Sequence, residues 1–217
     1  MEYSKTKRTT VVRAPRRAVY DRERVHAILD EAMICHVGFA GPDGRPFVLP
    51  TAYGRDGELL YLHGAAASRM MRSLAAGVPI CVTVTLLDGL VLARSAFHHS
   101  VNYRSVVLFG QATLVEDIAE KERALRLFTD HIVPDRWDAV RGPTPQELKA
   151  TTVLSMPIEE VSAKVRTGPP NDDDEDYALP IWAGILPCAV QYAAPIDDGR
   201  LAAGTEMPDH ISLYRRP

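Results

Sequence analysis

The chain has 217 residues, of which 46% are apolar and 24% charged, a composition typical of a globular protein with a hydrophobic core. The 25 Lys and Arg residues and 28 Asp and Glu residues give a net charge of −3, which provides no overall attraction to nucleic acid or to an anionic membrane. Because no apolar run approaches the roughly 20 residues of a membrane span, and the basic first residues lack the apolar stretch of a secretory signal, we expect a cytoplasmic protein without nucleic-acid or membrane partners.

The first half of the chain predicts a short helix followed by a meander of strands. Residues 1–20 are basic and irregular, and we expect an arm on the surface or on a partner subunit. Asp21 is a suitable N-cap, and apolar residues at helical spacing predict a helix over 22–32. The turn sequences GPDGR and GRDG then separate three apolar segments, which predict antiparallel strands at 33–40, 46–53 and 58–64.

The second half predicts further strands and two helices. Ser68 and Gly77 suit the start and end of a two-turn helix. A helix is also predicted over 118–132, and the acidic segment 168–176 is expected to be a solvated loop that buries nothing. Strands are predicted at 79–87, 90–95, 103–115 and 151–166, with a turn at Asp88-Gly89, a proline-containing loop at 134–145 and a bend near Pro157. Six or seven antiparallel strands with two or three helices predict a mainly β barrel with helical decoration.

The strongest local signal for a ligand is the segment from Leu59 to Met71, in which a strand is followed by small residues and a helix start at Ser68. A helix N-terminus presents unpaired N–H groups, and the guanidinium of Arg69 matches the oxygens of a phosphate. This pattern favours a phosphate site, although a capped surface helix with an exposed arginine explains the same residues.

A second polar segment, FHHSVNYRS, lies at 97–105 between two apolar strands and favours a cofactor contact or an interface. The adjacent His98 and His99 do not predict a metal site, because neighbouring residues of a strand point to opposite faces and no acidic residue is close in sequence. The three cysteines have no metal-binding spacing either, so no metal is expected.

These segments, in this order, resemble the pyridoxamine 5′-phosphate oxidase-like split-barrel FMN-binding proteins, and in particular the flavin-nucleotide-binding branch with the NimA-type nitroimidazole-resistance proteins. The similar stretches are 45–74, 79–115 and the sequence IWAGILP at 181–187. The resemblance implies a split-barrel flavin-binding domain over 21–195, between an N-terminal arm at 1–20 and a C-terminal tail at 196–217. It also implies a homodimer that holds FMN between its two subunits.

The resemblance assigns roles to individual positions. The strand residues Val48, Leu49, Pro50 and Thr51 would run along the flavin ring, and Leu62 and His63 would lie near the ribityl chain and phosphate. The phosphate would be held by Ser68, Arg69 and Met70. Further contacts would come from Asn102, Arg104 and Ser105, and from Trp182 of the second subunit. His63, or alternatively His98, corresponds to a histidine that the NimA-like branch places near the flavin.

Two departures from the family pattern bear on function. Met70 stands where the oxidase has a lysine, so Arg72 or Arg104 would have to supply the missing charge. No Lys or Arg occurs between Trp182 and Arg200, where the oxidase has basic residues for its substrate, so pyridoxamine phosphate is not the expected substrate.

The resulting hypothesis is a flavin-dependent oxidoreductase that acts on a small electron-poor compound, such as a nitro compound or a quinone, with NADH or NADPH as the candidate electron donor. No single residue stands out as a catalytic acid or base, which is compatible with redox chemistry carried by a flavin. The alternatives are a flavin-binding or flavin-sensing protein without turnover, and a barrel that uses F420 or haem in place of FMN.

Overall fold

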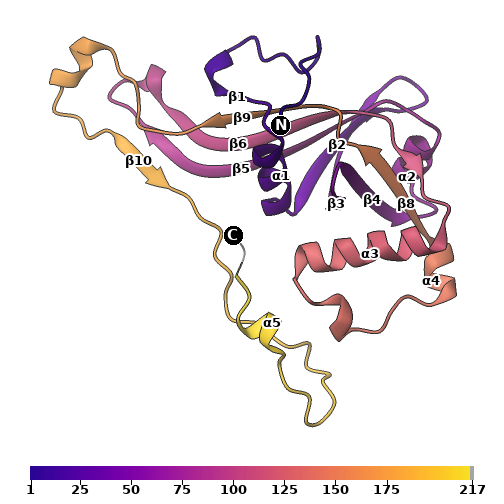
Figure 1. Cartoon of the computed structure of the whole chain (residues 1–217). Helices are drawn as coiled ribbons and strands as arrows, with labels where there is room; N and C mark the ends of the chain where they lie inside the picture. The colour runs from indigo at the N-terminus through magenta and orange to yellow at the C-terminus, as the bar shows by residue number, and fades with distance from the viewer. Residues whose placement is uncertain (216–217) are drawn as a thin grey trace.

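The structure, a computed structural model, describes residues 1–215, and ten antiparallel strands within them form one curled sheet (Figure 1). The order along the sheet is β1-β9-β6-β5-β2-β3-β4-β8-β7, and β10 pairs with β5. The strands are β1 (Ala18–Val19), β2 (Ile34–Ala40), β3 (Pro46–Asp56), β4 (Leu59–Ala65), β5 (Ile80–Leu92), β6 (Ser100–Gly110), β7 (Thr113–Leu114), β8 (Thr151–Pro157), β9 (Glu160–Arg166) and β10 (Gly184–Pro187).

Helices lie outside the sheet, and local capping explains where several of them begin. The helices are α1 (Arg22–Glu31), α2 (Arg69–Ala75), α3 (Ile118–Ile132), α4 (Pro145–Ala150) and α5 (Asp209–Ser212), with 3₁₀ turns η1 (Pro15–Arg17), η2 (Ala96–His98), η3 (Trp137–Ala139) and η4 (Asp174–Ala178). The side chains of Asp21, Ser68 and Asp117 each accept a hydrogen bond from a backbone N–H of the first turn.

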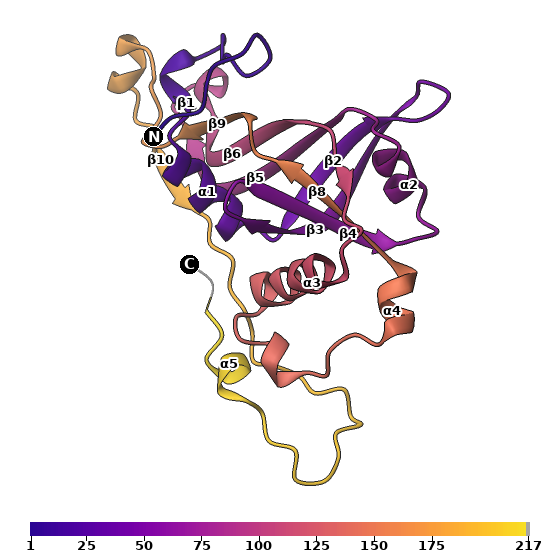
Figure 2. The ribbon, with the colours of Figure 1, turned by 45° about the vertical axis from the view of Figure 1, so that its right-hand side comes forward.

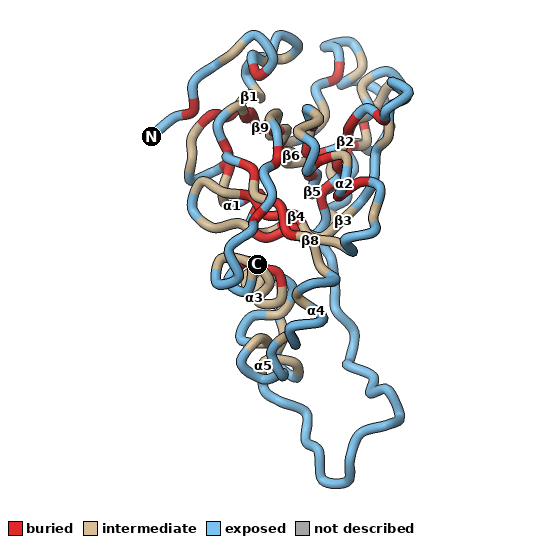
Figure 3. Tube along the Cα trace, turned by 90° about the vertical axis from the view of Figure 1, so that its right-hand side faces the viewer, coloured by how far each residue is buried: buried red, intermediate tan, exposed pale blue. Residues whose placement is uncertain are grey.

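The core lies inside the curled sheet, because strand alternation sends every second apolar side chain inward. Cys35, Val37 and Phe39 of β2 are buried, as the sequence predicted. Helix α3 covers the outside of β3 and β4 (Figure 2). The helix packs directly on Gly54, where an added Cβ would lie 3.4 Å from atoms of Leu127 and Phe128. The buried segments of Figure 3 accordingly gather in the sheet and its helices.

The prediction of a mainly β split barrel is confirmed, but the structure has ten strands where six or seven were expected. The additional strands include β1 and β7, which have two residues each and carry no periodic signal. The predicted turn at Asp88-Gly89 is wrong. β5 continues through these residues with a register shift between Leu87 and Gly89, and its far end is paired with β6 on one side and β10 on the other.

Two segments predicted as loops hold more structure than expected. Helix α4 begins within the proline-containing loop, where Thr144 and Glu147 form a capping box. The prediction that 168–176 buries nothing is wrong, because the Asp172 side chain is fully buried. It accepts hydrogen bonds of 3.0 Å from the backbone N–H and the guanidinium of Arg94.

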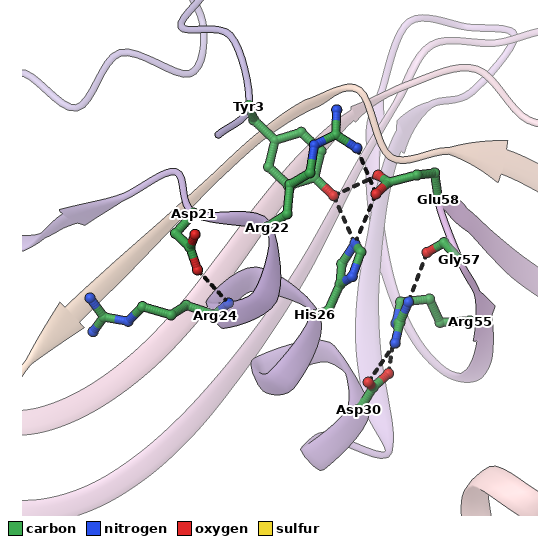
Figure 4. Close-up of polar contacts among 9 residues, drawn as sticks. All are labelled: Tyr3, Asp21, Arg22, Arg24, His26, Asp30, Arg55, Gly57 and Glu58. Carbon is green, nitrogen blue, oxygen red and sulfur yellow. Dashed lines mark hydrogen bonds and ion pairs between the residues drawn. The ribbon is translucent and has the colours of Figure 1, made fainter. Parts of the chain in front are cut away.

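The beginning of the chain is fixed to the barrel through a polar cluster (Figure 4). The buried Tyr3 donates a hydrogen bond of 2.7 Å to Glu58 Oε2, in the β3–β4 turn, and its hydroxyl lies 2.8 Å from Nε2 of His26 on α1. Arg22 pairs with Glu58 over 2.6 Å and lies over the Tyr3 ring. The N-terminal segment is therefore held by its own chain.

The C-terminal segment after β10 is largely exposed and runs away from the sheet (Figure 1, Figure 3). Its attachment to the rest includes Tyr214, whose hydroxyl donates to the Ile132 carbonyl over 2.8 Å. Within the segment, the ring of Tyr214 packs edge-on against Tyr192. Within residues 1–215, no helix is both long and apolar enough to cross a bilayer.

Candidate functional site

A cavity of about 490 Å³ lies between α2 and the β2–β3 turn. Arg69 and Arg72, which lie about one turn apart on α2, line one side, and Gly41 and Pro42 of the turn line another. The Arg69 guanidinium also stands over the ring of Phe47, 5.4 Å from its centroid. The predicted turn sequence GPDGR thus forms part of the candidate site, a role that its local pattern does not reveal.

The cavity carries positive charge that nothing in the described chain neutralises. Neither Arg69 nor Arg72 forms an ion pair within residues 1–215, and no carboxylate lines the cavity. Both side chains are exposed, so they remain free to meet an anion from solution. Two guanidinium groups beside one opening suit the oxygens of a phosphate.

The neighbouring predicted residues have different positions. Ser68 caps α2, with its Oγ accepting from Met71 N at 3.5 Å. The side chains of Met70 and Leu62 are buried in the hydrophobic core, so neither is directed at a polar ligand. Of the two residues considered as replacements for the missing lysine, Arg72 is the one that lines the cavity with Arg69.

The predicted ring-binding residues, Val48, Leu49, Pro50 and Thr51, lie in the first half of β3. This half pairs with β2, whereas the β3–β4 ladder starts only at Tyr53. One edge of β3 therefore has no strand partner from 46 to 52 among the described residues, which leaves backbone N–H and C=O groups available to a ligand. Val48 is also 65% exposed, so this part of the strand is open to solvent.

His63 lies on β4 and faces α3. Its ring centroid is 4.0 Å from that of Phe128, and its Nδ1 is buried with no hydrogen-bond partner in residues 1–215. Burial lowers the pKa of His63, because the charged imidazolium is disfavoured away from water. The residue is therefore a neutral, half-buried imidazole with one uncommitted nitrogen.

The predicted residues of β6 are already engaged within the chain. Arg104 is held between Glu31 and Asp88, whose hydrogen bonds raise the pKa of its guanidinium. Its charge is thus neutralised. Asn102 is buried and accepts a hydrogen bond from Arg166, while its Nδ2 donates to the Gly168 carbonyl over 3.2 Å.

The remaining predicted residues lie on β6, just before β10 and in η2. Ser105 is half-buried and opposite Thr85 in the ladder. Trp182 is exposed, and its ring lies so close to Gly184 that a Cβ there would be 3.0 Å away. His98 Nε2 lies 3.1 Å from Asp173 Oδ2. Within residues 1–215, no three His, Cys, Asp or Glu side chains cluster as metal ligands would.

Within one chain, the predicted site residues form two groups rather than one. The β3 and α2 residues are separated from those of β6 by the strands β2 and β5. At the usual strand spacing, Thr51 and Ser105 are about 14 Å apart. The sequence reasoning did not find Phe47, Gly41 or Pro42, which complete the first group, nor Arg166, which contacts Asn102 in the second.

The split-barrel fold is that of a known class of proteins. Residues 21–165 match the family model described as pyridoxamine 5′-phosphate oxidase. The chain therefore belongs to the pyridoxamine 5′-phosphate oxidase-like family, as its sequence motifs predicted. A search of curated proteins gives no significant match.

Solved structures include two similar proteins that align over nearly the whole chain. The flavocytochrome Anf3 from Azotobacter vinelandii is 45% identical with a TM-score of 0.91, and the alignment covers 98% of each chain. The FAD- and haem-binding protein from Mycobacterium smegmatis is 39% identical with a TM-score of 0.85, covering 90% of this chain and 95% of the other. A candidate 5-nitroimidazole antibiotic resistance protein from Bacteroides thetaiotaomicron is 25% identical with a TM-score of 0.59, covering 68% and 86%.

Proposed function

We propose that this protein binds a flavin nucleotide and acts as an oxidoreductase on a small electron-poor compound. Its membership of the family supports flavin binding, as does its similarity to a flavocytochrome and to an FAD- and haem-binding protein. The observation that carries the proposal is the cavity beside α2, in which Arg69 and Arg72 present two unneutralised charges.

The flavin would lie along β3 with its phosphate at α2. The unpaired edge of β3 supplies backbone donors and acceptors for the polar edge of the ring. Arg69 and Arg72 would hold the phosphate that follows the ribityl chain. This placement uses the FMN portion alone, which FMN and FAD share, so the sequence-based expectation of FMN and the FAD of the M. smegmatis relative are both compatible with it.

In the proposed redox reaction, the flavin and the protein have different roles. A bound flavin carries the electrons, and the chain binds the ring, orients it and limits the access of water. The core residues behind β3 make that side of the site apolar, while the exposed face of Val48 leaves room for a small substrate. Nitro compounds and quinones are suitable acceptors, with NADH or NADPH as the candidate donor.

A homodimer would complete the site. The two groups of predicted residues are separated within one chain by two strands, and a second copy that brings its β6 group to the first copy's β3 would let one flavin contact both groups. Ile34 and Val48 are exposed aliphatic residues on neighbouring strands, β2 and β3, and a second copy of the sheet would cover them. Sedimentation analysis tests this, because a monomer that retains flavin would contradict a shared site.

The central experiment is the absorption spectrum of the purified protein, before and after incubation with FMN and FAD. We expect flavin absorbance that survives gel filtration, and chromatography of the released cofactor identifies it as FMN or FAD. A protein that stays colourless after both incubations would refute the proposal.

Anaerobic titration with NADH and NADPH then separates an enzyme from a flavin-binding protein, since the flavin of the latter would not be reduced. F420 would reveal itself by its own distinct spectrum.

Haem binding is a second candidate function, favoured by His63. Iron is bound by a neutral imidazole nitrogen, and His63 has a buried Nδ1 that no group in the described part of the chain hydrogen-bonds. Two relatives that align over nearly the whole chain are a flavocytochrome and an FAD- and haem-binding protein. A Soret band after reconstitution with haem, lost in His63→Ala but retained in His99→Ala, would support this candidate. An unchanged haem spectrum in His63→Ala would assign the iron to another residue.

A further inference from the structure

A group of cations lies at the opposite end of the sheet from α2, where β9 meets the N-terminal segment. Lys164 and Arg166 are two residues apart on β9, so their side chains share a face. β1 pairs with β9 through Ala18 opposite Lys164, and Arg16 and Arg17, which directly precede β1, lie near enough to Arg166 for their charges to act on it. The η1 turn, which carries both arginines, packs against β9. We refer to Arg16, Arg17, Lys164 and Arg166 as the β9 cation cluster.

The positive charge of this cluster is uncompensated. None of its four members forms an ion pair within residues 1–215. Arg166 is bonded instead to neutral oxygens, namely Asn102 Oδ1 and the carbonyls of Gly168 and Pro169. These contacts hold the guanidinium in place without cancelling its charge. Burial, together with the nearby Arg17 and Arg16, lowers the pKa of Arg166, as expected where like charges gather without a counterion.

Hydroxyl groups on the neighbouring strand complete the polar surroundings. In the β6–β9 ladder, Ser105 lies opposite Lys164 and Tyr103 lies opposite Arg166, and paired residues share a face of the sheet. Both are half-buried. Cations with hydroxyl donors beside them are the groups that bind phosphate oxygens.

The β9 cation cluster is too far from α2 to bind the same phosphate. Phe47, which lies beneath Arg69, aligns across the sheet with Ile80, whereas Arg166 aligns with Leu87 at the other end of β5. The two places also differ by four strands across the sheet, so standard strand dimensions put them about 30 Å apart along the sheet. An anion at the cluster is therefore distinct from a flavin phosphate held by Arg69 of the same chain.

We propose that the β9 cation cluster is a second anion site, which binds the diphosphate of an adenine dinucleotide. A diphosphate carries two negative charges within reach of several cations, which matches a cluster of four better than a single carboxylate does. Two dinucleotides share this group: the adenylate half of FAD bound by the partner subunit, and NADH or NADPH as electron donor. The choice between these two rests on the proposed function, but the anion site itself does not.

The direct test is calorimetric titration of the purified protein with inorganic pyrophosphate and with ADP at low salt. We expect both to bind, with about tenfold weaker binding in Arg166→Gln and in Arg16→Gln/Arg17→Gln, and with affinity falling as salt rises. The double variant changes side chains at the surface and in a short turn, so it tests the site even if Arg166→Gln folds poorly. Arg24→Gln, an exposed cation elsewhere, should bind as the wild type does. An absence of binding, or equal affinity in all variants, would overturn the proposal.

Further titrations identify the dinucleotide. If FAD is the source, the wild type binds FAD more tightly than FMN and the double variant loses that preference. If the donor is the source, flavin affinities stay unchanged while the KM for NADH or NADPH rises in the double variant. If the wild type takes up no flavin but still binds ADP through these arginines, the proposed function fails and the anion site stands.

Discussion

The hydroxyl of Tyr3 donates a hydrogen bond of 2.7 Å to Glu58, which ties the beginning of the chain to the turn between β3 and β4. Burial of the Glu58 carboxyl would raise its pKa, but the hydrogen bonds from Tyr3 and Arg22 outweigh this and lower it. The carboxylate is thus stabilised in the folded state, and the N-terminal segment is held by a charge-assisted contact.

Replacing Tyr3 by Phe should lower the free energy of unfolding at pH 7 by about 1–2 kcal/mol, since the hydroxyl's hydrogen bond to a partly exposed carboxylate and its contact with His26 are lost while the ring remains. Because the pKa of Glu58 is depressed in the fold, its contribution is present above the ordinary pKa of a carboxyl group and is lost as the pH falls through the depressed value. Urea unfolding of both proteins at pH 7 and at pH 3.5 checks this. A difference that does not shrink in acid would contradict the assignment, and Tyr177→Phe, which loses an exposed hydroxyl, is the control.

Local signals in the sequence predicted the elements that depend on neighbouring residues. Asp21 and Ser68 accept bonds from N–H groups three residues away, so the starts of α1 and α2 could be predicted, and so could the buried face of β2. The burial of Asp172 could not, because its partner Arg94 is 78 residues away along the chain. Asp88-Gly89 has the composition of a turn, and only its pairing on both sides keeps it in β5.

The candidate site likewise contains residues that the sequence predicted and residues that it did not. The family motif predicted Arg69, and the structure shows it beside a cavity with Arg72. The motif also included Met70, whose side chain lies in the core because packing decides which face of α2 is buried. The β9 cation cluster was missed because Arg16 and Arg166 lie far apart in sequence and only the packing of η1 and β1 against β9 brings them together.

The contact between Asp172 and Arg94 predicts how the acidic segment behaves. Asp172→Asn removes the charge of a buried carboxylate and leaves the Arg94 guanidinium without its counterion. We expect the segment 168–178 to open more often and to be cut faster by a protease, as mass spectrometry of the fragments would show. Asp174→Asn, in the exposed part of the same segment, is the matched control. Equal cleavage rates in the two variants would mean that the ion pair does not hold the segment.

His63 predicts a specific pH dependence of stability. Burial lowers its pKa from the ordinary 6.5, so as the pH falls below that value the unfolded chain takes up a proton that the folded chain excludes. The wild type should therefore lose stability as the pH falls below about 6.5, and His63→Gln should lose less over an interval measured from pH 7 to pH 5. Thermal unfolding across the interval measures the slopes. His99→Gln, at an exposed position, should keep the wild-type slope, and a His63→Gln slope equal to it would refute the prediction.

The cavity beside α2 gives the most direct prediction for flavin binding. Combining Ser68→Ala with Arg69→Ala removes one guanidinium from the cavity together with the cap of α2, and flavin affinity should fall about tenfold or more, since a charge-assisted contact to phosphate is lost. Arg72→Ala alone should also weaken binding, because Arg72 supplies the second charge.

Riboflavin, which has the ring without a phosphate, separates the contribution of the phosphate from that of the ring. Its affinity should change little in either variant. Quenching of flavin fluorescence measures all of these affinities, with Arg126→Ala on α3 as an exposed, ion-paired control. If FMN and riboflavin lose affinity equally, the arginines act through the shape of the site, and if neither loses any, the phosphate is bound elsewhere.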